Sequence, residues 1–286
     1  MPSRPGAEGA EALARLSLNT ATVRPLDAVA GPDLIAMVDA CARAGIGWIA
    51  PWRQQFAQTP VADAARAVRD AGLRVSSLCR GGFFPAATAE ERRANVEDNL
   101  HAVDEAAELG TDVLVLVCGG VVGKDLAGSR QMVEDGIAAV LPHAAERGVR
   151  LGIEPLHPMF AADRSVVSTF GEANALAERL ASPWVGVVAD VYHVWWDPEI
   201  DTAIEGAREH LLGFHVNDWI VPLPDVLAGR GMMGDGVIDL RRLRVAVEGV
   251  GYQGPIEVEI FNQELWARPM DEVLELMKER YLQTVF

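Results

Sequence analysis

The sequence predicts a single (β/α)₈ barrel. Short runs rich in β-branched residues alternate along the chain with longer Ala-, Leu-, Glu- and Arg-rich segments at helical spacing. This alternation is typical of βαβ units around a parallel sheet. Eight strands and eight helices in strict alternation favour a closed barrel over an open doubly wound sheet, and 286 residues suit one such domain.

The first half of the chain supplies four strand–helix pairs. Glycines end the first three helices, at Gly45, Gly72 and Gly110, and a capping-box-like start from Thr88 to Glu91 opens the third. The expected strands are residues 16–19, 46–50, 74–78 and 112–117, and the expected helices are residues 32–44, 61–71, 88–109 and 129–147.

The second half repeats the pattern with strands that carry Glu154, Asp190, His215 and Glu259 at or near their carboxyl ends. Helices are expected at residues 171–181, 201–209, 240–250 and 270–283. No stretch has the composition of a linker. We therefore expect a flexible N-terminal tail over residues 1–12 and one barrel over residues 13–286.

Composition excludes several classes of protein. The formal charge is −16, from 41 acidic and 25 basic residues, which argues against a nucleic-acid backbone or an anionic membrane as the main partner. The three cysteines show no CxxC spacing, so neither a disulfide framework nor a structural zinc site is expected. We find no apolar segment typical of a secretory signal or a membrane span, and expect a cytoplasmic protein.

The four polar strand ends predict a metal site. In a barrel the carboxyl ends of all strands share one face, so Glu154, Asp190, His215 and Glu259 should converge. Any one of them alone would more simply cap a strand or join a surface ion pair, but four consecutive strands favour a shared role. Three carboxylates and one imidazole suit a hard divalent ion, with Mn²⁺ preferred and Mg²⁺ or Co²⁺ as alternatives.

Two further histidines follow these strand ends. His193 lies three residues after Asp190 and could reach substrate oxygens, and His157 lies three residues after Glu154. The alternative for each is a ring that hydrogen-bonds a loop carbonyl.

The loops on the same face supply candidate substrate contacts. Aromatic rings there would suit the apolar faces of a sugar or an aromatic aglycone, and cations could meet an anionic group. The alternatives are loop packing for the rings and pairing with nearby acids for the cations. The candidates are Trp52, Phe83, Trp196 and Trp219 together with Arg80 and Arg230.

The motif Glu154, Asp190-x-x-His193, His215 and Glu259 resembles the xylose-isomerase-like sugar isomerase/epimerase superfamily, which includes ketose 3-epimerases, hydroxypyruvate isomerases and inosose dehydratases. The resemblance covers essentially the whole barrel. It implies that the two glutamates, the aspartate and His215 bind one divalent ion. It also implies that the glutamates act as acid and base, and that His193 contacts a substrate oxygen.

The sequence departs from the ketose 3-epimerases in two places. Their substrate-binding arginine, a few residues past the metal histidine, has no counterpart in Trp219-Ile220-Val221, and Arg230 is the nearest arginine. His157 replaces a small polar residue. The catalytic subunits of C-glycoside deglycosidases, which look like the same barrel, use a histidine base on 3-keto glycosides.

The resemblance implies a divalent-metal-dependent sugar or keto-sugar isomerase or epimerase that transfers a proton through a metal-bound enediolate. The alternative is a metal-dependent lyase of the C-glycoside deglycosidase or inosose dehydratase kind. A nuclease like endonuclease IV would need more metal histidines and a basic groove, and a metal-free binding barrel would not need four polar strand ends. The expected partner is a small carbohydrate. The expected assembly is a homo-oligomer, or a complex with a second subunit if the protein is a lyase.

Overall fold

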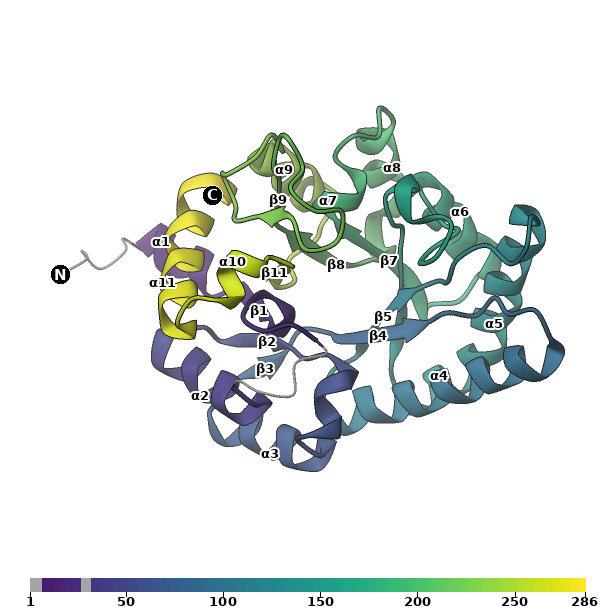
Figure 1. Cartoon of the computed structure of the whole chain (residues 1–286), viewed down its shortest axis with the longest axis horizontal. Coiled ribbons are helices and arrows are strands. Elements are labelled where there is room, and N and C mark those ends of the chain that lie inside the picture. Colours follow the sequence, from purple (N-terminus) through teal and green to yellow (C-terminus); the bar gives the residue numbers. More distant parts are fainter. Residues whose placement is uncertain (1–6, 27–31) are drawn as a thin grey trace.

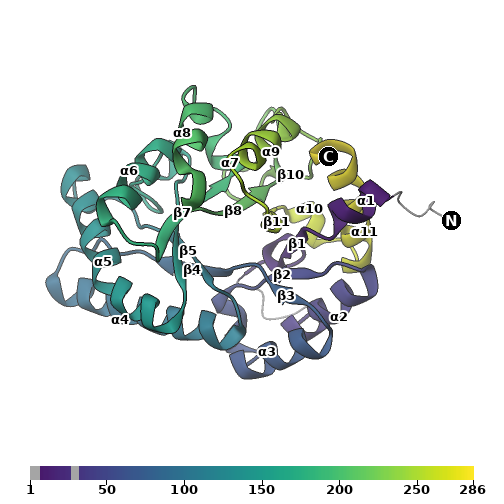
Figure 2. The ribbon, with the colours of Figure 1, turned by 180° about the vertical axis from the view of Figure 1, so that it is seen from behind.

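The protein is a parallel β-barrel surrounded by helices, as Figure 1 and the reverse view in Figure 2 show. The computed structural model describes residues 7–26 and 32–286. The strands are β1 (Leu16–Asn19), β2 (Trp48–Ala50), β3 (Arg74–Val75), β4 (Leu78–Gly82), β5 (Val113–Val117), β6 (Arg150–Glu154), β7 (Val185–Asp190), β8 (Leu211–Val216), β9 (Asp218–Trp219), β10 (Arg230–Gly231) and β11 (Ile256–Val258). The helices are α1 (Ala7–Leu13), α2 (Leu34–Ala44), α3 (Val61–Asp70), α4 (Ala89–Leu109), α5 (Leu126–Arg147), α6 (Phe170–Leu180), α7 (Val191–Val194), α8 (Ile200–Ala207), α9 (Leu240–Gly249), α10 (Gln263–Trp266) and α11 (Met270–Arg280).

The barrel closes through a strand that is broken in the middle. Hydrogen-bonded neighbours follow the order β3-β2-β1-β11-β8-β7-β6-β5-β4, so β3 and β4 stand at the two ends of this order. Both overlap the strand expected at residues 74–78, which Ser76 and Ser77 interrupt, and β4 continues beyond its expected end. Because the chain itself joins them, and a parallel bridge links Trp52 to Cys79, the ring is complete.

The expected elements are found with shifted ends. The second strand begins at Trp48 instead of residue 46, and the third extends to Gly82. Helix α5 begins three residues before its expected start because the Asp125 carboxylate accepts the N–H of Gly128 at 2.8 Å and caps the helix there.

The N-terminal segment is more ordered than the expected tail. Residues 7–13 form α1, which lies beside α11 in Figure 1, and the Tyr281 hydroxyl donates to the carbonyl of Ala12 at 3.3 Å. Residues 1–6 lie outside the described residues. None of the described helices is both long and apolar enough to cross a membrane.

A short hairpin that the sequence analysis did not predict crosses the loop between β8 and α9. β9 pairs with β10 in antiparallel register, Trp219 opposite Arg230. The Asp218 carboxylate fastens it by accepting the N–H groups of Trp219 at 2.8 Å, Gly234 at 2.9 Å and Ile238 at 3.0 Å. The hairpin carries Arg230 back to the barrel mouth.

Side chains alternate along each strand between the helix layer and the barrel interior. Ile256 and Val258 of β11 face the helices and belong to the main apolar core, and Glu257 between them points inward. β1 repeats this pattern, with Leu16 and Leu18 in that core. The interior-facing position of β11 is therefore a buried carboxylate.

Candidate metal centre and active-site cavity

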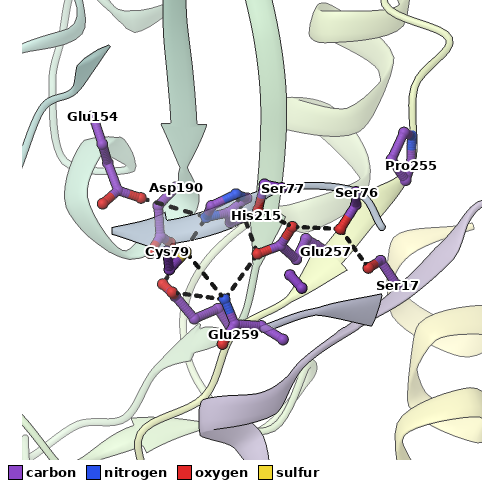
Figure 3. Close-up of polar contacts among 12 residues, drawn as sticks. Ser17, Ser76, Ser77, Cys79, Glu154, Asp190, His215, Pro255, Glu257 and Glu259 are labelled. Atoms are coloured by element: carbon purple, nitrogen blue, oxygen red, sulfur yellow. Dashed lines mark hydrogen bonds and ion pairs between the residues drawn. The ribbon is translucent and has the colours of Figure 1, made fainter. Parts of the chain in front are cut away.

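Four strand ends bring the predicted ligands together. Glu154 and Asp190 are the last residues of β6 and β7, His215 lies in β8, and Glu259 follows β11 directly. Asp190 lies beside His215 in the register of β7 and β8, which sets the two level. One donor atom from each of the four lies within 4.8 Å of the others, and all four residues are buried (Figure 3).

Two atoms of this cluster have no hydrogen-bond partner in the described part of the chain. Glu154 Oε1 and His215 Nδ1 are buried 3.4 Å apart, and His215 Nδ1 is also 3.9 Å from Glu259 Oε2. Leaving a buried polar atom unpaired costs about 1–3 kcal/mol unless a ligand satisfies it. Three carboxylates and one imidazole are donors that a hard divalent ion accepts, so these residues fit one such ion.

Burial and mutual proximity change the proton affinity of the cluster. Burial raises the pKa of Glu259 to about 8 and outweighs the opposing effect of Arg230, and it also raises the pKa of Glu154. Burial disfavours the charged form of His215, but Glu257 and the neighbouring carboxylates raise its pKa to about 10. In the absence of a cation the site therefore retains protons that a cation would displace.

Arg230 reaches the cluster from β10. Its Nη1 donates to Asp190 Oδ2 at 2.8 Å and to Glu259 Oε2 at 2.9 Å, and its Nη2 lies 3.2 Å from His193 Nε2. Burial alone would raise the pKa of Asp190, but the guanidinium holds that pKa below its usual range. The Arg230 side chain also lines the cavity above the cluster. Its expected contact with substrate stays a prediction.

The two candidate histidines take different positions. His193, on α7, lines the cavity, and its Nδ1 accepts the N–H of His157 at 3.2 Å. Burial lowers the pKa of His193 to about 3, so its ring is neutral. The His157 ring lies outside this cavity lining, against Trp196 and Trp219, and its Nδ1 accepts the N–H of Met159 at 3.2 Å.

A cavity of about 400 Å³ opens directly above the cluster. Of the predicted residues it contains Glu154, His193, Glu259, Trp52, Arg80 and Arg230. Its apolar wall includes Val117, Leu156, Phe160, Phe261 and Trp266. A second cavity, about 500 Å³, lies at the opposite end of the barrel, where residues such as Trp48, Asp112 and Pro255 precede or start the strands. None of the four clustered ligands lines it.

Three of the predicted aromatic contacts lie outside the cavity lining. Trp196 donates its Nε1–H to the carbonyl of His193 at 2.8 Å, and Trp219 packs on Tyr192 with 4.7 Å between ring centres. Phe83 lies under Arg80, whose guanidinium carbon is 4.0 Å from the ring centre. Trp196 and Phe83 therefore contact the wall residues His193 and Arg80, whereas Trp52 is itself part of the wall.

Two cations in the cavity wall lack a close acidic partner. The Arg80 side chain makes no hydrogen bond or ion pair within residues 7–26 and 32–286. Burial, followed by the charge of Arg164, lowers the pKa of Arg80 to about 10. Arg164 is 3.9 Å from the Asp163 carboxylate, at the limit of an ion pair. Together they make this part of the cavity wall cationic.

The sequence analysis missed a polar layer below the cluster. Asn19 Nδ2 donates to Glu257 Oε1 at 2.8 Å and to Glu259 Oε1 at 3.0 Å, and Asn19 Oδ1 accepts Trp52 Nε1–H at 2.7 Å. The signal that could have found it is the Glu257-x-Glu259 spacing, because residues two apart in a strand share a face.

Comparison with known proteins places the chain in a family. Residues 38–280 match the family described as xylose isomerase-like TIM barrel. A crystal structure of a Sinorhizobium meliloti 1021 protein superposes with a TM-score of 0.91 at 50% identity, covering 95% of this chain and 98% of that one.

Curated relatives include two kinds of enzyme. The 3-dehydroshikimate dehydratase of Pseudomonas putida is 29% identical over 207 residues, which make up 70% of this chain and 31% of the dehydratase, so the chain spans about a third of that protein. The L-ribulose-5-phosphate 3-epimerase UlaE of Escherichia coli K12 is 24% identical over 203 residues, 69% of this chain and 68% of the epimerase. Since the family match extends over most of its length, the chain belongs to the xylose isomerase-like TIM barrel family.

Proposed function

We propose that the protein is a divalent-metal-dependent isomerase or epimerase that moves a proton at a carbon next to a carbonyl group, in a sugar or keto-sugar. One observation carries the proposal. Two buried carboxylates, Glu154 and Glu259, line the same cavity and belong to a donor cluster that fits one divalent ion. Mn²⁺ is the proposed ion, with Mg²⁺ or Co²⁺ as alternatives.

The two glutamates supply the acid and the base. When bound, the cation would act as a Lewis acid for negative charge that develops on substrate oxygens. Glu154 ends β6 and Glu259 follows β11, and β7 and β8 separate these strands in the ring. They therefore face a substrate from different sides. One carboxylate takes the proton from the carbon, and the other, in its protonated form, returns a proton to the opposite face.

The environment of the glutamates suits proton exchange. A general acid or base works best when its pKa is close to the working pH, and burial moves the pKa of both groups upward from the usual range of a carboxylic acid. The neutral ring of His193 would orient substrate oxygens through Nε2, and Arg230 would hold its neighbouring carboxylates in place.

The test is hydrogen exchange. The Mn²⁺-loaded protein is incubated in D₂O with a panel of free ketoses and 3-keto glycosides, and deuterium incorporation and product are read by NMR. The proposal expects deuterium at the carbon next to the carbonyl with the carbon skeleton intact, and loss of exchange in Glu154→Gln. No exchange with any substrate would contradict it.

A dehydratase is the second candidate, and the cationic wall favours it. Arg80 and Arg164 would hold an anionic group such as a carboxylate, and a dehydratase is among the relatives. The first step is the same. One glutamate takes the proton next to the carbonyl, the electron pair expels a β-hydroxyl group, and the other glutamate protonates it so that water leaves. Adding 3-dehydroshikimate to the panel distinguishes the two, because only a dehydratase gives a product lacking one water.

The C-glycoside deglycosidase alternative assigns the base to His157, and the His157 ring lies outside the cavity lining. A nuclease is disfavoured by the charge of −16 and by a single histidine in the cluster. The cytoplasmic location, the carbohydrate as partner and the homo-oligomer stay predictions.

A further inference from the structure

A third inward-facing glutamate lies on the far side of His215 from the substrate cavity. Glu257 precedes Glu259 by two residues, so both side chains point into the barrel. Glu257 stands beside His215 in the register of β11 and β8. It is 2% exposed and is absent from the lining of the cavity above the cluster, so it is not placed to contact substrate.

Neutral donors hold the Glu257 carboxylate in one orientation. Oε1 accepts Asn19 Nδ2–H at 2.8 Å. Oε2 accepts the hydroxyls of Ser76 at 2.8 Å and Ser77 at 2.9 Å, and both serines are labelled in Figure 3. Ser17 Oγ lies 2.8 Å from Ser76 Oγ and extends the network. Within the described residues no lysine or arginine pairs with this carboxylate, so the His215 imidazole is the one group that can be cationic at ion-pair distance from it.

The two nitrogens of His215 face different groups. Nε2 lies 3.5 Å from Glu257 Oε1, whereas Nδ1 faces Glu154 and Glu259 and has no hydrogen-bond partner in the described chain. A neutral imidazole carries one N–H. Carboxylates face both nitrogens, so a bound divalent ion would decide where the proton lies. With the ion held among Glu154, Asp190 and Glu259, the Nδ1 lone pair would face the ion and the proton on Nε2 would face Glu257.

We propose that Glu257 is a positioning residue of the metal centre, which fixes His215 with its proton on Nε2 and thereby strengthens binding of a divalent ion through Nδ1. The Asn19 amide that donates to Glu257 also donates to Glu259 at 3.0 Å, so the same layer orients a second ligand. The inference rests on metal binding by the cluster and not on the reaction catalysed. Loss of such outer partners typically weakens metal affinity by about 10–100-fold.

The experiment measures Mn²⁺ affinity of the metal-free full chain by isothermal titration calorimetry. Glu257→Leu removes the acceptor and should weaken binding by about 10–100-fold. Glu257→Gln keeps an oxygen that can accept Nε2–H and should fall between Glu257→Leu and the wild type. The matched control is Glu248→Gln, which removes a carboxylate that pairs with Arg15 and Arg244 outside the barrel interior and should leave affinity unchanged.

A second readout separates positioning from general destabilisation. In the Mg²⁺-loaded, ¹⁵N-labelled protein, long-range ¹H–¹⁵N spectra should show His215 protonated at Nε2 and not at Nδ1. Glu257→Leu should expose that proton to faster exchange with water. If Glu257→Leu fails to fold by circular dichroism, Glu257→Gln and a Ser76→Ala/Ser77→Ala double variant, which frees Oε2, carry the test and should each weaken binding.

Equal affinity in folded Glu257 and serine variants, or a proton on Nδ1, would overturn the inference, as would a wild type that binds no Mn²⁺. A protein that binds Mn²⁺ in this Glu257-dependent way but exchanges no substrate proton would contradict the proposed function alone.

Discussion

The two sides of the His215 ring show two ways of burying carboxylates. On the cavity side, Glu154 Oε1 and His215 Nδ1 are buried without hydrogen-bond partners in the described chain. On the other side, Glu257 accepts three hydrogen bonds from neutral side chains. Both groups lie deep in the barrel, so burial alone does not distinguish a ligand from a support.

The two sides differ in the hydrogen-bond partners of their buried polar atoms. The Glu257 carboxylate has all its hydrogen-bond partners within the protein. The unpaired ligand atoms of Glu154 and His215 have none, so a partner from outside the chain would have to satisfy them. This contrast favours ligand binding at Glu154 and His215, the two members of the cluster with unpaired atoms. It assigns orientation to the layer beneath.

The largest effect is expected on the cavity side. Glu154→Gln should reduce the rate of substrate proton exchange by about 10²–10⁴-fold, because it removes an acid/base group. The metal-free protein should be as stable as the wild type or more stable, because a neutral amide replaces a buried carboxylate that repels Asp190 and Glu259. Rates by NMR and melting temperatures with chelator present check both. A Glu154→Gln variant that keeps its activity, or one that unfolds, would contradict the functional difference between the two sides of the His215 ring.

The second prediction concerns pH. His215 carries a proton below a pKa of about 10 in the metal-free protein, and binding requires the neutral ring. The pKa of Glu259, about 8, acts in the same direction. Mn²⁺ affinity should therefore rise with pH, by up to about tenfold per unit for each proton released, between about pH 6 and pH 8. Calorimetry in buffers of different ionisation enthalpy counts the protons, and an affinity independent of pH would contradict the protonated cluster.

A smaller effect is expected at the cavity wall. Arg80→Gln should raise KM about tenfold for an anionic substrate, since a charge-assisted hydrogen bond contributes about 1.5–3 kcal/mol, and should change kcat little. Arg164→Gln should have a weaker effect because its side chain is 36% exposed. A neutral substrate serves as the control. Equal loss with neutral and anionic substrates would mean that Arg80 supports the wall and does not bind an anion.

The smallest effect is expected for His157→Ala. Its ring packs on Trp196 and Trp219 outside the cavity lining, so proton exchange should change by less than about threefold. Steady-state rates on the best substrate of the panel check this. A loss comparable to that of Glu154→Gln would instead favour the histidine-dependent lyase.

The sequence was sufficient for the barrel and for the convergence of the cluster. Both follow from the alternation of elements and from the rule that strand ends in a barrel share one face. For Arg230 the sequence left substrate contact and pairing with nearby acids both open, because its contact with Asp190 and Glu259 depends on the β9–β10 hairpin, whose turn has no strong local signal. The contacts of Glu257 join residues in β1, beside β4 and in β8 to β11. These segments are distant in sequence, so only the folded barrel brings them together.

His157 illustrates the limit of spacing arguments. It follows Glu154 by three residues, as His193 follows Asp190, yet only the His193 ring lines the cavity. His157 caps a short 3-10 helix, Pro158–Phe160, by accepting the N–H of Met159, and its ring is not part of the cavity lining. His193 stays at the cavity because α7 begins at once after Asp190.

The central claim is that the unpaired side of His215 belongs to a site for one divalent ion. The most direct measurement is Mn²⁺ stoichiometry and affinity of the chelator-treated protein by calorimetry, with Glu154→Gln and Glu248→Gln titrated in parallel. We predict one ion per chain for the wild type and Glu248→Gln, and binding weakened by at least about tenfold in Glu154→Gln, which loses a charged ligand. No bound Mn²⁺ in the wild type, or equal affinity in all three proteins, would contradict the account.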